Sequence, residues 1–227
     1  MEIAPGHGMG PSPVRRKALT LFGIALAVVV VDQAVKYWMV DELTTRFDGL
    51  RTVGARVAAL YGTPPPEGFD GLHFRPKRSF TVSPDYLRIR YAENTGAAFG
   101  LFRNLPPPVR GPLFHLVSIG AVILITFYYL RLPAGSHAER FARAGLPLVL
   151  GGALGNYVDR LARGFVIDFV EAHWHDRVAW PSFNVADSCI VVGVALLLLD
   201  GLVRREPKGA VTPAGEQAGQ GGPPPVC

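Results

Sequence analysis

Four long apolar blocks constrain the fold of this chain more than any other feature of its sequence. They cover residues 18–40, 112–132, 141–158 and 185–203, and each is 18 to 23 residues long. A helix of that length crosses the roughly 30 Å hydrocarbon core of a bilayer. We therefore expect a membrane all-α core in which four transmembrane helices form a bundle. The alternative is a soluble bundle of four buried helices, but such helices normally carry a polar stripe, and residues 185–203 carry almost none.

The first apolar block is predicted to be an uncleaved membrane anchor. Its run of 23 residues exceeds the roughly 7–15 apolar residues of a signal peptide. In addition, no small-residue cleavage site precedes "DELTTRF" at residues 41–47.

The placement of charge predicts the orientation of the chain. The net charge is +5, and basic residues lie just before the first block, at 15–17, and just after the last, at 204–208. By the positive-inside rule, residues 1–17 and 204–227 are expected in the cytoplasm. Their composition predicts that both are disordered tails. The segment 41–111 is then a long periplasmic loop. Its ten Lys and Arg residues argue against a periplasmic location. However, loops longer than about 60 residues are translocated across the membrane largely regardless of their charge.

With this orientation, nine polar residues fall at the outer membrane interface. Asp32 and Lys36 lie four residues apart on one helix face, and we interpret them as a structural ion pair with Lys36 extending towards the interface. Polar groups in a membrane are costly, so a cluster at one depth is a hypothesis for a functional site. The other members are Asn94, Asn156, Asp159, Arg160, Asp168, Asn184 and Asp187.

The third block is the least apolar of the four and is rich in Gly, Ala and Leu. Gly151, Gly152 and Gly155 lie just before its polar end. Because these residues lack side chains, we expect another helix to approach them closely.

Asp168 and Asp187 have the residue types of an acid–base pair. Two carboxylates about 3 Å apart cannot both ionise, so one keeps a proton. The charged member can activate water while the protonated member hydrogen-bonds a scissile carbonyl, which predicts direct water attack without a covalent intermediate. Paired aspartates in membrane proteins are at least as often ion carriers, so a small proton-coupled transporter is an alternative. A transporter would have polar residues at the bilayer midplane and broken helices, often in inverted repeats.

Other chemistries have weaker support in the sequence. His173 and His175 alone are too few for a zinc site, and their His-Trp-His segment is interpreted as an interfacial anchor. No Gly-rich phosphate loop or nucleic-acid motif occurs, and the basic residues form no stripe. Cys189 and Cys227 indicate no disulfide framework. We expect no metal, no cofactor and no nucleic-acid partner.

Three motifs together resemble the lipoprotein signal peptidase family, also called signal peptidase II. They are "NTGAAFG" (94–100), "GGALGNYVDRLARGFVIDFV" (151–170) and "FNVADS" (183–188), and "VDQAVK" (31–36) resembles the first-span motif of that family. The resemblance implies a bacterial inner-membrane aspartyl peptidase with four spans. Such an enzyme removes the signal peptide from prolipoproteins by cutting just before a cysteine that carries a diacylglyceryl group.

The resemblance also implies roles for individual residues. Asp168 and Asp187 would be the catalytic dyad. Asp32 and Lys36 would be structural supports near the site, and Asp159 would fix Arg160 or the local fold. The remaining residues would line the pocket and position the substrate or the dyad: Asn94, Gly96, Asn156, Arg160 and Asn184.

The resemblance further implies the surroundings of the enzyme. A small extramembrane β-sheet would cradle the substrate near the periplasmic face, with residues near 86–102 contributing to it. The multi-pass chain would lie in the inner membrane with both termini in the cytoplasm. Its partners would be diacylglyceryl prolipoproteins and membrane lipids, and it would be a monomer by default. A third alternative is a non-catalytic lipid-binding or assembly subunit.

One segment departs from the family pattern. Residues 44–80 of the loop match no family motif and contain the Pro-rich stretch "GTPPPEG". This insert would be a lid, a partner site or surface decoration, and we adopt decoration as the interpretation. The motifs on both sides of the insert are intact, so it concerns substrate access more than the chemistry.

Overall fold

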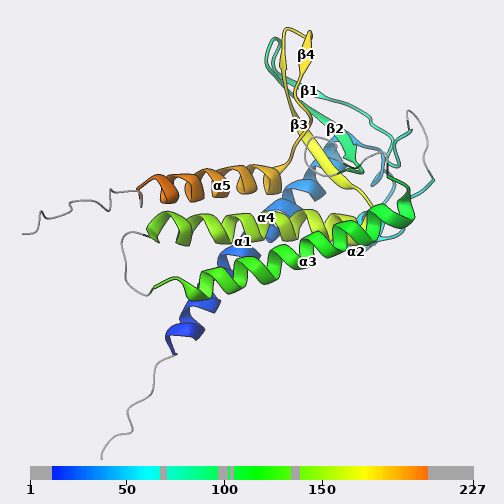
Figure 1. The fold of residues 1–227 in the computed structure, drawn as a ribbon. Coiled ribbons are helices and arrows are strands. Elements are labelled where there is room, and N and C mark those ends of the chain that lie inside the picture. Colours follow the sequence, from blue (N-terminus) through cyan, green and yellow to red (C-terminus); the bar gives the residue numbers. More distant parts are fainter. Residues whose placement is uncertain (1–11, 67–70, 97–101, 103–104, 134–138, 204–227) are drawn as a thin grey trace, which may run out of the picture.

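The computed structural model describes residues 12–66, 71–96, 102, 105–133 and 139–203. Within them, the chain forms a bundle of long helices with a small β-sheet at one end (Figure 1). The predicted C-terminal tail, 204–227, and most of the predicted N-terminal tail lie outside the described residues. Residues 97–100 of the "NTGAAFG" motif also lie outside them.

Helix α1 covers Pro13–Leu43 and begins before residue 17, where the N-terminal tail was expected to end. Ser12 and Pro13 account for the early start. The Ser12 hydroxyl accepts a hydrogen bond from the Arg15 amide at 3.3 Å, and proline is favoured in the first turn of a helix. The expectation of disorder for residues 13–17 is therefore wrong, and the basic residues there are helical.

Three further long helices complete the bundle: α3 (Pro107–Arg131), α4 (Arg140–Arg163) and α5 (Val185–Val203). In Figure 1, α5, α4 and α3 lie one below another, and α1 crosses behind them obliquely. α4 contacts each of the other long helices. It is therefore the central helix of the bundle.

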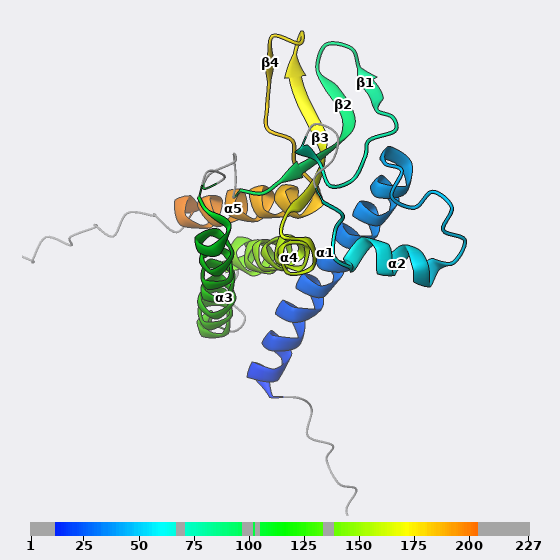
Figure 2. The ribbon, with the colours of Figure 1, turned by 90° about the vertical axis from the view of Figure 1, so that its right-hand side faces the viewer.

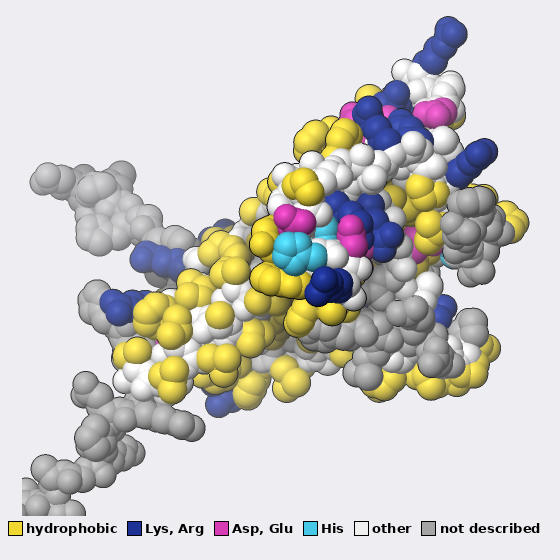
Figure 3. All heavy atoms as spheres, turned by 90° about the horizontal axis from the view of Figure 1, so that it is seen from above, with side chains coloured by type: hydrophobic (Ala, Val, Ile, Leu, Met, Phe, Trp, Pro, Cys, Tyr) yellow, Lys and Arg dark blue, Asp and Glu magenta, His cyan; other side chains and the backbone are white. Residues whose placement is uncertain are grey.

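Three of the four long helices, α1, α3 and α5, are long and apolar enough to cross a membrane. Only 22%, 11% and 17% of their apolar windows, respectively, is buried inside the protein. Figure 3 shows hydrophobic side chains over the helices and charged side chains gathered towards the sheet. Exposed apolar faces of this extent need hydrocarbon around them. They contradict the alternative of four buried helices in a soluble bundle.

The fourth predicted span, residues 141–158, stays a prediction. α4 has 24 residues, which is enough length to cross a bilayer, but it is not among the helices that are apolar enough. Charged residues at both of its ends lower its hydropathy, for example Arg140 and Asp159. Because α4 is surrounded by the other helices, its charged groups can face protein instead of lipid.

Glycines allow α4 to approach α1 closely, which confirms the prediction for the third block. A Cβ atom at Gly151 would lie 2.6 Å from the Cβ of Val28, and one at Gly155 would lie 2.8 Å from Asp32 Oδ2. Atoms in a packed interior do not come this close without displacement. Any larger residue would therefore push the two helices apart at the level of Asp32.

A four-stranded antiparallel sheet, in the order β1-β2-β3-β4, lies at one end of the bundle. Its strands are β1 (Phe80–Ser83), β2 (Leu87–Asn94), β3 (Val166–Trp174) and β4 (Val178–Ala179). β2 lies within residues 86–102, which were expected to contribute to the sheet, whereas β3 was not predicted. Gly164 ends α4 with a φ of 81°, which lets the chain turn directly into β3. The expected small sheet is thus confirmed.

The insert 44–80 is not surface decoration, so the interpretation adopted from the sequence is wrong. It contains helix α2 (Val53–Tyr61) and three buried apolar residues, Phe47, Leu60 and Phe74, none more than 1% exposed. They form a single core with residues of α1 and of the strands, namely Met39, Val40, Leu43, Tyr91, Phe165, Ile167 and Phe169. The insert is therefore part of the hydrophobic core beneath the sheet.

Candidate active site

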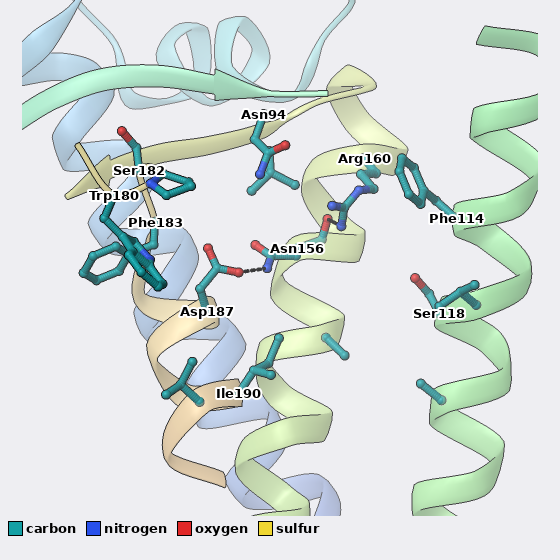
Figure 4. Close-up of a pocket in the computed structure, with 16 residues that line it drawn as sticks. Asn94, Phe114, Ser118, Asn156, Arg160, Trp180, Ser182, Phe183, Asp187 and Ile190 are labelled. Carbon is teal, nitrogen blue, oxygen red and sulfur yellow. Dashed lines mark hydrogen bonds between the residues drawn. The ribbon is translucent and has the colours of Figure 1, made fainter. Parts of the chain in front are cut away.

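A pocket of about 310 Å³ lies between α3, α4, α5 and the segment that leads into α5. Figure 4 shows Asn94, Asn156, Arg160 and Asp187 around its polar part, on β2, α4 and α5. Most of the other lining residues are apolar or small. They are Phe114, Val117, Ser118, Ala121, Ala153, Val166, Trp180, Pro181, Ser182, Phe183, Ile190 and Val191.

Asp187 is held at the start of α5 by reciprocal hydrogen bonds with Asn184. Asn184 Oδ1 accepts from the Asp187 amide at 2.9 Å, and Asp187 Oδ2 accepts from the Asn184 amide at 3.2 Å. This is the arrangement of a capping box, in which residues three apart satisfy free amides in the first turn of a helix. Asn156 Nδ2 donates to the other oxygen, Oδ1, at 2.8 Å (Figure 4). Both carboxylate oxygens of Asp187 are therefore fixed.

Asp168 is 2% exposed and pairs with Ala92 of β2 in the sheet. Its Oδ1 accepts a hydrogen bond from Asn184 Nδ2 at 2.7 Å. Burial, and next the nearby charge of Asp187, raise the pKa of Asp168 to about 8, against the opposing effect of the bond from Asn184. This raised pKa favours the protonated form of the Asp168 carboxyl at neutral pH.

Asn184 links the two aspartates, and Asn156 supports this link. Asn184 contacts Asp168 through its side-chain amide and Asp187 through its backbone amide. The same side chain donates to Asn156 Oδ1 at 3.1 Å, and Lys36 Nζ donates to that oxygen at 3.2 Å. Because two donors occupy the Asn156 oxygen, its NH₂ group is directed at Asp187.

Lys36 is at the centre of a buried ionic network next to the aspartates. Its Nζ lies 2.7 Å from Asp32 Oδ2 and 2.9 Å from Asp159 Oδ2, and all three side chains are 0% exposed. Asp159 also pairs with Arg163, whose side chain is equally buried. Two cations balance two carboxylates. Buried charges need such compensation, because an unpaired one would lose its hydration without replacement.

The network also holds the backbone just before each aspartate. Asp159 Oδ2 accepts from the amide of Ile167 at 3.1 Å, and Asp32 Oδ1 accepts from the amide of Ala186 at 2.9 Å. Ile167 precedes Asp168, and Ala186 precedes Asp187. Lys36 contacts both carboxylates, so a single ammonium group connects the two backbone positions.

Arg160 joins the strand end to the helices at the pocket wall. Its Nη2 donates to the Gly96 carbonyl at 2.8 Å, and its guanidinium carbon lies 4.6 Å from the centroid of the Phe114 ring. Asn94 Oδ1 accepts from the Gly96 amide at 2.9 Å. Gly96 therefore connects Asn94 and Arg160, which both line the pocket.

The structure brings all ten predicted site residues to one end of the bundle. Lys36 differs from its expected role, and Asp159 takes one of the two roles considered for it. Lys36 is fully buried and does not extend to the interface, because Asp32 and Asp159 together compensate its charge. Of the two roles considered for Asp159, its bonds to Lys36, Arg163 and the Ile167 amide support fixing the local fold.

Sequence reasoning assigned no role to several residues that the structure places here. Gln33 Nε2 donates to Asp159 Oδ1 at 2.9 Å and to Asp32 Oδ2 at 3.0 Å. A glutamine inside an apolar span is a visible signal, because it needs a buried partner. Arg163 and Phe114 give no such signal, since a basic residue at a helix end and an aromatic residue in an apolar segment are common.

The His-Trp-His segment lies at the far end of the β3–β4 hairpin. His175 Nδ1 lies 3.1 Å from Asp85 Oδ1, and His173 Nδ1 lies 3.5 Å from Asp176 Oδ1. Among the residues that the structure describes, no group of three or more His, Cys, Asp or Glu side chains could hold a metal ion. These histidines therefore take part in polar contacts within the hairpins.

The arrangement holds two carboxyl groups in different surroundings. Burial raises the pKa of Asp168, whereas Asp187 accepts hydrogen bonds from the Asn156 side chain and the Asn184 amide. Carboxyl groups with such different surroundings can divide the acid and base roles of a hydrolysis. The apolar walls around them suit a hydrophobic ligand.

A family model described as signal peptidase (SPase) II matches residues 24–203. Among curated proteins, the lipoprotein signal peptidase of Anaeromyxobacter sp. is 44% identical over 183 residues, which cover 77% of this chain and 80% of the relative. The lipoprotein signal peptidase of Pseudomonas putida is 33% identical over 190 residues, which cover 84% of this chain and 91% of the relative.

Two solved structures share the fold, and both are described as bacterial membrane enzymes determined by the in meso method. The structure at 2.3 Å resolution is 26% identical, with a TM-score of 0.54, and the match covers 84% of this chain and 94% of the other. The structure at 1.9 Å resolution is 25% identical, with a TM-score of 0.52, and the match covers 82% and 94%.

Proposed function

This chain belongs to the signal peptidase II family, and from this premise we propose how its two aspartates cleave a lipoprotein precursor. It is a bacterial membrane protease that processes lipoproteins. The substrate is a prolipoprotein whose cysteine already carries a diacylglyceryl group, and the peptide bond just before that cysteine is broken. The transporter alternative is not favoured, because the matching family and relatives are peptidases.

Asp187 acts as the base and Asp168 as the acid in the first step. A water molecule gives a proton to Asp187 as its oxygen attacks the carbonyl carbon, and Asp168 gives its proton to the carbonyl oxygen. The product of this step is a tetrahedral diol. Asp187 then protonates the leaving nitrogen as the C–N bond breaks, and one diol hydroxyl returns its proton to Asp168. No acyl-enzyme forms.

One observation carries this assignment: Asn184 hydrogen-bonds both aspartates, at 2.7 Å to Asp168 and at 3.2 Å to Asp187. Carboxyl groups that share a neutral donor in this way are held near each other. The charge of Asp187 then helps to keep the proton on Asp168, consistent with the raised pKa.

The pocket walls support a lipid-linked substrate. On one side α3 contributes Phe114, Val117 and Ala121, and on the other α5 contributes Ile190 and Val191. An apolar channel between two helices would accept acyl chains or a hydrophobic signal peptide directly from the bilayer. Asn94 and Arg160 supply polar groups at its rim that could orient the peptide backbone.

We place the pocket at the periplasmic face of the inner membrane and both termini in the cytoplasm. The basic residues 15–17 begin α1, whereas Asp32 and Lys36 lie in its later turns. The positive-inside rule puts the basic end in the cytoplasm and hence the site at the outer face. Accessibility labelling of single cysteines placed at Ser12 and at Asp85 would test this orientation, and labelling of both from the same side would contradict it.

A gel-shift assay of prolipoprotein processing in membranes tests the function itself. Asp168→Asn and Asp187→Asn are each expected to accumulate unprocessed precursor, with a rate lower by about 10³-fold or more. Asp85→Asn is the matched control, because Asp85 is an exposed aspartate of the hairpins, and it should process normally. Near-normal processing by either dyad variant, at equal membrane levels, would defeat the assignment.

A further inference from the structure

The insert 44–80 packs against the back of the strand that carries Asp168. Side chains alternate along a strand, so Ile167 and Phe169 face the opposite side of β3 from Asp168. Both belong to the buried cluster that includes Leu60 and Phe74 of the insert. A segment outside the family motifs therefore supports the strand on which a catalytic residue lies.

The last turn of α2 directs its free carbonyls at arginines. Arg163 Nη1 donates to the Leu60 carbonyl at 3.0 Å, and Arg46 Nη2 donates to the Ala59 carbonyl at 2.8 Å. Carbonyls at a helix C-terminus lack partners within the helix and carry partial negative charge, which stabilises a nearby cation. The contact with Arg163 connects α2 to the candidate site, because the Arg163 guanidinium also pairs with Asp159.

Tyr61 makes a second connection to the same network. Its hydroxyl donates to Gln33 Oε1 at 3.0 Å, and Gln33 in turn donates to Asp32 and Asp159. The Tyr61 ring also lies 5.4 Å from the guanidinium carbon of Arg163, within the range of a cation–π contact. Figure 2 shows α2 beside α1 and the near end of α4, where these contacts occur.

We propose that the last turn of α2, through Leu60 and Tyr61, is a positioning element of the active site. This proposal rests on the proposed function of the aspartate dyad. The Leu60 carbonyl and the Tyr61 hydroxyl hydrogen-bond Arg163 and Gln33, and these two side chains contact Asp159 and Asp32. The carboxylates of Asp159 and Asp32 in turn accept hydrogen bonds from the backbone amides that precede the dyad. In this chain the insert has thus become part of the catalytic scaffold.

The expected consequence is a loss of turnover without a loss of substrate binding. Residues 53–61 do not line the pocket, so changes there leave the groups that touch the substrate in place. Displacing reacting groups by about 1 Å can cost about 10²-fold in rate. Such a loss appears in kcat, whereas an altered binding surface appears in KM.

Steady-state kinetics on a fluorescent peptide with a diacylglyceryl cysteine, using the full-length enzyme, tests the proposal. Tyr61→Phe keeps the ring and removes only the hydroxyl, and it should lower kcat about fivefold to tenfold with KM within about twofold. Arg163→Gln removes the buried charge and should lower kcat about 100-fold. Arg163→Lys restores the charge and should recover about tenfold of that loss.

Two exposed positions of the same insert provide matched controls. Arg51→Gln and Val57→Ala should keep kcat within about twofold of wild type, because neither side chain is buried. A merely structural insert would give variants with reduced stability but a normal kcat in the folded fraction. That result, or a loss confined to KM, would overturn the proposal. If Arg163→Gln does not fold, Tyr61→Phe decides the question alone.

Asp168→Asn in the same assay separates this proposal from the proposed function. If that variant retains turnover, the dyad assignment is wrong and the positioning role falls with it. If that variant is inactive while Tyr61→Phe and Arg163→Gln turn over at the wild-type rate, only the positioning role is wrong.

Discussion

Asn184 and Asp187 exchange hydrogen bonds across the first turn of α5, so the helix start and the position of the proposed catalytic carboxylate are one structural unit. Asn184 also contacts Asp168 at 2.7 Å with its side-chain amide. The residue that caps the helix therefore also sets the geometry of the dyad.

Asn184→Ala should impair both stability and catalysis. Loss of the cap should cost about 1 kcal/mol of the free energy of unfolding. Because the bond from Asn184 lowers the pKa of Asp168, its removal should raise that pKa and move the alkaline limb of activity to higher pH. Ser12→Ala, which removes the cap of α1, is the control. It should lose similar stability and keep its pH profile, and equal profiles for all three proteins would contradict the role of Asn184.

The decrease of kcat/KM at alkaline pH should follow the loss of the proton from Asp168. Activity should be level near neutral pH and fall as the pH rises through about 8, where Asp168 loses the proton that it donates to the carbonyl. The raised pKa also favours the folded state at low pH, and this stabilisation is lost progressively between about pH 4 and about pH 8. A rate profile from about pH 5 to about pH 10 measures the limb. Activity that increases steadily to the upper end would be inconsistent with Asp168 as the acid.

Lys36→Met should be among the most damaging single changes. It leaves Asp32 and Asp159 with only Arg163 for compensation in a buried site. Removing one partner of a buried ion pair typically costs about 3–5 kcal/mol. The double variant Asp32→Asn/Lys36→Met restores charge balance and should recover part of that loss. Chemical unfolding of the four proteins of this double-mutant cycle measures the coupling, and additive losses would argue against a shared network.

Gly155→Ala should lower activity by displacing Asp32. The new Cβ would lie 2.8 Å from Asp32 Oδ2 and 3.3 Å from the Cβ of Ala186, the residue before Asp187. Gly120→Ala is the matched control, because nothing lies within 4 Å of a Cβ built there. Alanine favours helix over glycine by about 1 kcal/mol, so the control should be as stable as wild type or more so. Equal turnover by both variants would show that α1 and α4 adjust freely.

The sequence predicted those parts of the fold that depend on local patterns. Uninterrupted apolar runs predicted α1, α3 and α5 because hydrocarbon length and composition leave few alternatives. The family resemblance predicted that residues near 86–102 contribute to the sheet, and β2 lies among them. The sequence could not reveal β3, because residues 166–169 are buried without any alternation in exposure and a short apolar run fits a strand or a connection equally well.

The site was predictable as a set of residues but not as a network. Motifs placed ten residues at one end of the bundle, yet they gave no partner for Lys36 beyond Asp32. Whether a lysine extends to water or stays buried depends on carboxylates supplied by other helices, and Asp159 is more than a hundred residues away along the chain. The contribution of α2 was hidden for the same reason, because its contacts with Arg163 and Gln33 are tertiary.

The turnover numbers of Asp168→Asn, Asp187→Asn and the double variant test the central claim most directly. Residues that act as one unit are not additive, so each single change should reduce kcat by about 10³-fold or more and the double change should be no worse than either. A substantial rate for either single variant, or a double variant slower than both by the product of their effects, would contradict a paired acid and base.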